Sequence, residues 1–230
     1  MRLHNFPSMK ISGHPAAKSA GSSFLAVRWI PRTSPRDDKR VWLALCAVIL
    51  WPSCQASFNI RPELFPKRVD ASEIRLKDTK DNAVEFDQLH KNGAVMFFFQ
   101  TKCPCVKRYQ NRITRLQNRY GKHGISFFYV SSNSNESFSD VMEEAKKRRL
   151  SLPLLRDEGG HLAKLLGAQG TPTAAIINGH GELVFLGWID NERQENETGR
   201  IAYLENAIID VINLRAISAP TSPMFGCAIR

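Results

Sequence analysis

The stretch VMFFFQTKCPC, residues 95–105, decides the fold of this chain. Its first five residues are bulky and apolar, which is typical of a strand buried on both faces. From Val106 to Tyr120 apolar residues recur at helical spacing, so a buried strand is predicted to pass into a helix near Cys103. Unpaired N–H groups at the start of a helix stabilise negative charge. The sequence thus puts a cysteine where its thiolate, the reactive form, is favoured.

Cys103 is therefore the predicted nucleophile. Pro104 suits the first helical turn, because its missing N–H would have no partner there in any case. Lys102, Lys107 and Arg108 add positive charge close to the sulfur. The alternative is a structural cysteine, since free cysteines are often buried. The junction and its basic neighbours favour a reactive sulfur that solvent can reach.

The rest of the chain alternates strands and helices without an internal repeat. This order predicts an α/β fold, with a mixed central sheet and helices on both faces. The predicted strands are 72–76, 93–100, 125–130, 152–155 and a hairpin of 173–177 with 182–188; the predicted helices are 84–89, 106–120, a segment from Ser137 or Ser139 to Arg149, 161–166 and 201–214.

The first 56 residues differ from the rest in charge and pattern. They carry eight of the 32 Lys and Arg residues but two of the 22 acidic residues, so +6 of the net charge of +10 lies here. A basic flank, a short apolar run at 41–51 and small residues up to Ala56 are typical of a secretory signal. The run is shorter than the roughly 20 residues that a membrane span needs. Cleavage after Ala56, lipidation at Cys54 and an uncleaved buried segment are the alternatives.

These features predict a leader at 1–56, a folded domain at 57–218 and a tail at 219–230. The protein is expected to be exported, to the periplasm or another extracytoplasmic space, with membrane contact only through the leader. The remaining charge is mixed along helix faces such as residues 143–147, so no nucleic-acid partner is expected. The histidines are scattered, and no metal or cofactor is predicted.

Three of the five cysteines follow the leader: Cys103, Cys105 and Cys227. An odd number favours redox chemistry over a framework of structural disulfides.

The order of elements, with Cys103 after the first long strand and residues 170–173 (GTPT) before the hairpin, resembles the thioredoxin fold over roughly residues 65–215. Within that fold, the chain resembles bacterial redoxins related to alkyl hydroperoxide reductase and thiol-specific antioxidant proteins, which carry a Cys-Pro-x-Val site and a C-terminal Gly-Cys-x-Ile tail. The segments that carry this resemblance are 103–109, 131–133, 153–157, 167–172, 187–191 and 221–229.

The resemblance implies a role for Thr171 and Pro172. In thioredoxin-like proteins the matching proline is cis and lies beside the nucleophile, and the residue before it pairs with an extended substrate. A proline that merely starts a strand is the alternative.

Two cysteines compete to resolve a bond to Cys103. Cys105 lies two residues along the helix, where side chains project about 200° apart, so a Cys103–Cys105 bond needs a distorted first turn. The alternative is that Cys105 only fills space at a position where the related proteins carry a tyrosine. Cys227 lies in a tail to which Pro and Gly residues give conformational freedom, so it could fold back and resolve the bond, and this role is favoured. The alternative is a frayed chain end without a role, which is common.

The leading prediction is an exported thiol-disulfide oxidoreductase, in which the Cys103 thiolate attacks a disulfide and Cys105 or Cys227 resolves it. Its partners would be a disulfide- or thiol-bearing protein or a small oxidant, and a reducing thiol. One alternative is a peroxiredoxin-like thiol peroxidase, but Gln100 and Met96 stand where its threonine and proline would lie. The other is a non-catalytic module that binds metal or a partner through Cys103 and Cys105.

Overall fold

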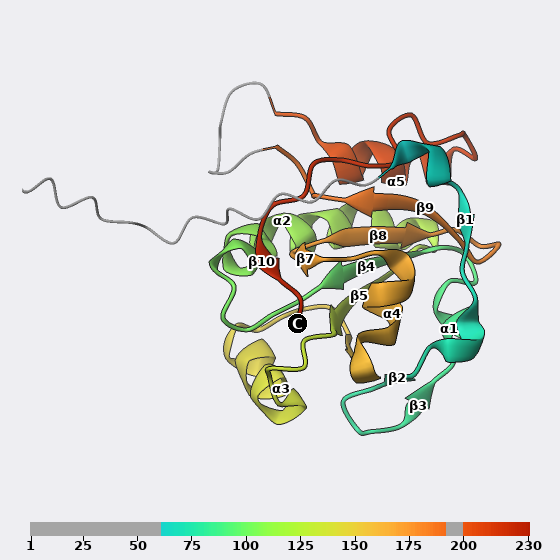
Figure 1. Ribbon diagram of the computed structural model, residues 1–230. Coiled ribbons are helices and arrows are strands. Elements are labelled where there is room, and N and C mark those ends of the chain that lie inside the picture. Colours follow the sequence, from blue (N-terminus) through green and yellow to red (C-terminus); the bar gives the residue numbers. More distant parts are fainter. Residues whose placement is uncertain (1–60, 192–199) are drawn as a thin grey trace, which may run out of the picture. The chain divides into compact units, whose positions relative to one another are not determined.

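An eight-stranded mixed sheet forms the centre of the part of the chain that the structure describes (Figure 1). This computed structural model describes residues 61–191 and 200–230, and the predicted leader with its apolar run lies outside these ranges. The strand order is β1-β9-β8-β4-β5-β6-β2-β3. The strands are β1 Lys67–Arg68, β2 Leu76–Lys77, β3 Ala83–Val84, β4 Ala94–Phe98, β5 Ser126–Ser131, β6 Leu154–Asp157, β8 Ala174–Ile177 and β9 Glu182–Gly187.

Strand β4 lies in the middle of the sheet, parallel to β5 and antiparallel to β8. All five of its residues are buried. Val95 and Phe97 belong to the apolar cluster on one face, whereas Met96 and Phe98 belong to the cluster on the other. A strand covered on both faces has no polar side, which explains the unbroken apolar run in the sequence.

Helices cover both faces of the sheet, as the sequence predicted. Residues of α2 and α5 share the cluster of Val95 and Phe97, and residues of α1 and α4 share the cluster of Met96 and Phe98. The fold is thus α/β and thioredoxin-like. The helices are α1 Phe86–Leu89, α2 Pro104–Tyr120, α3 Phe138–Lys147, α4 His161–Leu166 and α5 Tyr203–Ile212.

Several predicted elements have other bounds in the structure: β6 is Leu154–Asp157 rather than 152–155, and Val84, predicted to begin a helix, lies in β3. Two further differences have a clear local cause. Residues 72–76 were expected to form one strand, but Ala71–Glu73 is a turn of 3-10 helix, with the Asp70 carboxylate accepting a hydrogen bond from the Ser72 N–H, and only Leu76 enters β2. Local side-chain capping outcompetes strand pairing here. The last helix begins at Tyr203 rather than 201, so Ile201 falls outside the buried stripe and is 49% exposed.

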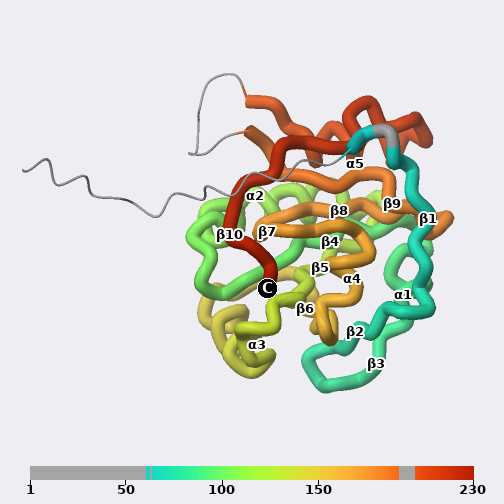
Figure 2. Tube along the Cα trace, viewed as in Figure 1, coloured from blue at the N-terminus to red at the C-terminus, as the bar shows by residue number. Residues whose placement is uncertain are grey.

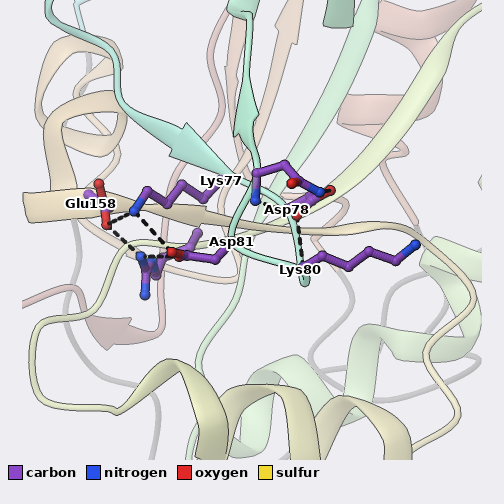
Figure 3. A network of polar contacts seen from close by, with 7 residues as sticks. Lys77, Asp78, Lys80, Asp81 and Glu158 are labelled. Carbon is purple, nitrogen blue, oxygen red and sulfur yellow. Dashed lines mark hydrogen bonds and ion pairs between the residues drawn. The ribbon is translucent and has the colours of Figure 1, made fainter.

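The β2–β3 turn is tied to β6 by a group of charged side chains (Figure 3). The Lys77 ammonium lies 3.2 Å from a carboxylate oxygen of Glu158 and 3.4 Å from one of Asp81. Arg156 pairs with the same two carboxylates. These side chains are partly exposed, and such pairs contribute at most about 1 kcal/mol each. They fix the edge of the sheet and lie outside the cysteine site.

A second, two-stranded sheet joins the tail to the domain. β7, Gly170–Thr171, pairs antiparallel with β10, Cys227–Ala228, so that Cys227 lies opposite Thr171. Figure 2 follows the chain from the end of α5 to this pairing. The sequence did not predict either strand, because a two-residue strand has no periodicity to detect.

Candidate active site

Cys103 is the residue immediately before helix α2, and Pro104 occupies its first position. This is the geometry that the strand-to-helix junction predicted. The first N–H groups of α2 have no partner within the helix, so they present partial positive charge near the Cys103 side chain. The neighbouring Lys102 and Lys107 are exposed to solvent.

The loop before Cys103 is held by two charged side chains that the sequence reasoning missed. The Glu136 carboxylate accepts hydrogen bonds from the backbone N–H groups of Thr101, at 3.1 and 3.2 Å to its two oxygens, and Lys102, at 3.4 Å, and it also bonds the Thr101 hydroxyl. Arg148 donates to the Thr101 carbonyl oxygen. Both residues lie more than 30 positions from the cysteine, so no local spacing reveals them. They position the entry to α2.

The Thr171–Pro172 peptide bond is cis, as the resemblance implied. It lies beside the cysteine: the Cys103 Sγ donates a hydrogen bond of 3.2 Å to the Thr171 carbonyl oxygen. The Thr171 hydroxyl lies 3.3 Å from the Gln100 side-chain oxygen and 3.4 Å from the Cys227 carbonyl oxygen. Three of the predicted site residues thus meet in one place, with Cys227 as the fourth.

Cys227 reaches this site through the β7–β10 pairing. It is a free thiol, as is Cys103. Burial raises the pKa of the Cys227 thiol to about 12, and hydrogen bonding and charge interaction with the neighbouring Cys103 act in the same direction. A second thiol therefore lies next to the predicted nucleophile, protonated at neutral pH.

Cys105 is buried inside the first turn of α2 and is disulfide-bonded. Cys103 and Cys227 are both free, so neither of them is its partner. Cys103 precedes the helix in an extended conformation, so the two side chains do not follow helical spacing. The structure brings Cys103, Thr171, Pro172 and Cys227 together, whereas the Cys105 sulfur is held in a disulfide of its own.

Cys103 is only 1% exposed, although the sequence led us to expect a sulfur that solvent reaches. It shares a buried cluster with Met224, which the tail contributes. Met224 is more than 100 positions away along the chain and Thr171, which contacts the sulfur, is 68 positions away, so local sequence could not predict the burial. The sulfur is enclosed, but it is enclosed beside Pro172 rather than far from it.

Next to the site lies a buried ion pair that joins α2 to the segment after β9. The Arg112 Nη1 lies 2.7 Å from the Asp190 Oδ1, and the two side chains are 3% and 0% exposed. The Arg112 guanidinium also stacks over the Tyr109 ring, 4.7 Å from its centroid. Burial raises the pKa of Tyr109 to about 12. The Tyr109 ring contacts the Trp188 ring edge-on. This aromatic contact holds Trp188 against α2, which carries Tyr109.

Within residues 61–191 and 200–230, no group of three or more His, Cys, Asp and Glu side chains has the arrangement of a metal site. In the same ranges no helix is both long and apolar enough to cross a membrane.

Comparison with known proteins identifies the family of the chain. The redoxin family model matches residues 65–202, more than half of the chain. The chain belongs to the redoxin family. The match covers β4, the start of α2 with Cys103, and the Thr171–Pro172 bond, but it ends before the tail.

Two curated relatives share one name, thiol-disulfide oxidoreductase ResA. The thiol-disulfide oxidoreductase ResA of Halalkalibacterium halodurans is 28% identical over 151 residues, which cover 64% of this chain and 85% of the relative. The protein of that name from Bacillus thuringiensis subsp. konkukian is 24% identical over 147 residues, 63% of this chain and 82% of the relative. Both relatives are named as thiol-disulfide oxidoreductases, which is consistent with a thiol-dependent oxidoreductase activity for this redoxin.

Solved structures share the fold. An uncharacterised conserved protein from Geobacillus kaustophilus has a TM-score of 0.64 at 24% identity, over 76% of this chain and 96% of that one. A hypothetical protein from Sinorhizobium meliloti 1021 has a TM-score of 0.62 at 22% identity, over 75% and 96% of the two chains.

Proposed function

We propose that this redoxin is a thiol-disulfide oxidoreductase in which Cys103 attacks a substrate disulfide and Cys227 resolves the mixed disulfide. The observation that carries the proposal is the shared contact at Thr171: the Cys103 Sγ bonds its carbonyl oxygen, and Cys227 lies opposite it in the β7–β10 pair. A thiolate attacks one sulfur of a disulfide and the other sulfur leaves. Cys103 would become linked to the substrate, and Cys227 would then attack the Cys103 Sγ and release the substrate as a thiol.

The buried environment supports this order of events. The start of α2 presents unpaired N–H groups to the Cys103 side chain, which suits Cys103 to the first attack. Cys227 has no such helix end, and burial raises its pKa, so it is held as a thiol while the tail is docked. The substrate of the protein would be a protein disulfide. A dithiol would then reduce the Cys103–Cys227 disulfide back to two thiols.

The peroxidase alternative is less well supported at the positions that would build its pocket. Met96 is fully buried in the core, and the Gln100 side chain contacts the Thr171 hydroxyl. Neither position supplies the threonine hydroxyl that would hold a peroxide beside Cys103. Export of the protein through the leader remains part of the proposal, supported by the basic flank and the apolar run at 41–51.

Cys227→Ser tests the assignment of the resolving residue. With a disulfide substrate such as insulin, we expect this variant to accumulate the Cys103–substrate mixed disulfide and to lose most of its turnover, because no second thiol lies beside Cys103. Mass spectrometry after acid quenching and non-reducing digestion identifies the trapped bond. The matched control is Ala228→Ser, at the exposed neighbour of Cys227 in β10, which leaves every cysteine in place and should keep turnover and show no trapping.

If Cys105→Ser traps substrate and Cys227→Ser does not, the resolving role belongs to Cys105. A separate trial with hydrogen peroxide distinguishes the two enzyme classes: rapid peroxide consumption without insulin reduction would contradict the disulfide reductase.

The reactivity of Cys227 in the reduced protein should depend strongly on pH. Only the thiolate reacts with an alkylating agent, and at a pH below the pKa its fraction rises tenfold per pH unit. Because burial, the largest cause, raises the pKa of the docked Cys227 to about 12, we expect the rate of its alkylation by iodoacetamide to rise about tenfold per unit between pH 6 and 9. Peptide mass spectrometry of protein labelled at several pH values gives this rate. A rate that levels off below pH 9 would mean that Cys227 is not held at this site in the reduced protein.

A further inference from the structure

The tail is bound along its whole described length, from β9 to the loop after β5. The Leu186 N–H donates to the Pro220 carbonyl oxygen at 3.0 Å, and the Trp188 N–H donates to the Ser222 hydroxyl at 2.6 Å. At its far end, the Arg230 N–H donates to the Asn133 side-chain oxygen at 2.9 Å. A frayed terminus would have none of these bonds.

Between these ends the tail fills specific positions with specific side chains. Met224 is 1% exposed, and its sulfur accepts a hydrogen bond from the Thr173 hydroxyl at 3.3 Å. Phe225 packs edge-on against the Trp188 ring, with 5.5 Å between centroids. Cys227 and Ala228 continue as β10 along β7, beside the start of α2 (Figure 1).

Gly226 is the tightest point of this contact. A Cβ atom there would lie 2.2 Å from the Thr171 carbonyl oxygen and 3.0 Å from its carbon, and its φ is +139°. The atoms that it would meet belong to the backbone next to Pro172, which cannot give way as a flexible side chain can. The tail therefore reaches the carbonyl oxygen that Cys103 contacts only because residue 226 lacks a side chain.

The edge of β7 is thus occupied, and Cys103 beneath it is 1% exposed. An extended polypeptide that adds a strand to a sheet needs free backbone groups at the edge. In this state no such groups are available at Thr171. Any disulfide that Cys103 attacks must first take the place of the tail.

We propose that residues 223–230 are a self-docked strand that a substrate polypeptide replaces at β7, and that the return of this strand both resolves the mixed disulfide and expels the substrate. The inference rests on the proposed function and adds a substrate class to it. The site takes an extended, cysteine-bearing polypeptide whose local sequence resembles the tail. A residue without a bulky side chain precedes the reactive cysteine, as Gly226 does, and an aromatic residue two before it stacks on Trp188, as Phe225 does.

Bonds and electrons balance over the two steps of this exchange. The Cys103 thiolate bonds to one sulfur of the substrate disulfide, and the other sulfur leaves as a thiolate and takes up a proton. When the tail returns, the Cys227 thiolate bonds to the Cys103 Sγ, the bond from Cys103 to the substrate breaks, and the second substrate sulfur leaves. The substrate has gained two electrons and the enzyme holds a Cys103–Cys227 disulfide, which an external dithiol reduces.

Gly226→Val tests this inference on the reduced, full-length protein. The added side chain should expel the tail from Thr171, so we expect native iodoacetamide labelling of Cys103, followed by peptide mass spectrometry, to become at least about tenfold faster than in the wild type. The matched control is Gly121→Val, where the nearest atom to an added Cβ lies 3.7 Å away in a side chain, and the backbone is helical. Its labelling rate should equal that of the wild type.

A second measurement asks whether the exposed edge binds a peptide. A fluorescent peptide with the sequence of residues 221–230, carrying Cys227→Ser, should bind the Gly226→Val protein and not the wild type, whose own tail competes at high effective concentration. The same peptide with Gly226→Val should not bind. Phe225→Ala, a smaller change, serves as the variant if Gly226→Val disturbs folding, as judged by its thermal unfolding.

Equal labelling rates in the wild type, Gly226→Val and Phe225→Ala would overturn the inference, as would a freed Cys103 that binds no peptide. Neither readout requires turnover. Failure of the proposed reductase activity would therefore leave both results intact and would be seen separately in the insulin assay.

Discussion

Cys103→Ser should abolish disulfide reduction. A serine hydroxyl at the start of α2 remains protonated at neutral pH, and no other free thiol among the described residues lies at a helix start. We expect the rate of insulin reduction to fall on the order of a thousandfold, to the level of the dithiothreitol background, because loss of a nucleophile removes the covalent route entirely. The measurement is insulin turbidity at fixed dithiothreitol.

The structure offers a control for this variant. Serine is close to cysteine in size, and the Thr171 carbonyl oxygen that accepts from the Cys103 Sγ can accept from a hydroxyl. Thermal unfolding should therefore stay near that of the wild type, and the tail should stay docked. Ala228→Ser, which leaves every cysteine in place, should retain activity. Substantial turnover by Cys103→Ser would move the nucleophile to another sulfur and contradict the mechanism.

The part of the site that lies within one continuous stretch could be predicted from sequence. The apolar run at 95–99 has no polar side because β4 is covered on both faces, and the helical spacing after Val106 follows from the packing of α2 on that strand. A short-range pattern of this kind is what periodicity records. The start of α2 at Cys103 follows from it directly.

The part that depends on distant contacts could not be predicted in the same way. β7 and β10 are two residues each, and their register is set by the docking of the tail and by the missing side chain of Gly226. Cys103 is 1% exposed and shares its buried cluster with Met224 of the tail, so the expectation of an accessible sulfur was wrong. Glu136 and Arg148, which hold the loop before Cys103, are brought there by the fold and not by any motif.

The resemblance to redoxins supplied what spacing could not. It implied the cis bond at Pro172, which the structure confirms, and it included the tail through its Gly-Cys-x-Ile pattern. The roles of Thr171 and Cys227 stay predictions. Their contacts in the structure are what make those predictions specific enough to test.

The buried pair of Arg112 and Asp190 should be a main source of stability near the site. Arg112→Met removes the cation and leaves the Asp190 carboxylate, whose side chain is 0% exposed. One partner that this carboxylate keeps is Arg200, whose Nε lies 3.4 Å from its second oxygen and whose side chain is 40% exposed. Breaking a buried pair by removal of one partner costs about 3–5 kcal/mol in the free energy of unfolding. We expect a loss of this size in urea denaturation, and a fall in melting temperature of roughly 10 °C.

A surface pair on the same helix provides the control. Arg119 contacts Glu205 at 2.6 Å, but its side chain is 64% exposed, so Arg119→Met should cost no more than about 1 kcal/mol. The double variant Arg112→Met with Asp190→Leu should recover part of the loss, because it leaves no charge buried without its partner. Equal effects of Arg112→Met and Arg119→Met would show that the buried pair does not stabilise the fold.

The effect should extend from stability to the tail. The Arg112–Asp190 pair and Tyr109 hold Trp188 against α2, and Trp188 in turn carries the ring of Phe225. Arg112→Met should therefore loosen the tail and speed the labelling of Cys103, whereas Arg119→Met should not. If labelling stays slow in Arg112→Met while the free energy of unfolding falls, the pair stabilises the domain without fixing the strand that covers its cysteine.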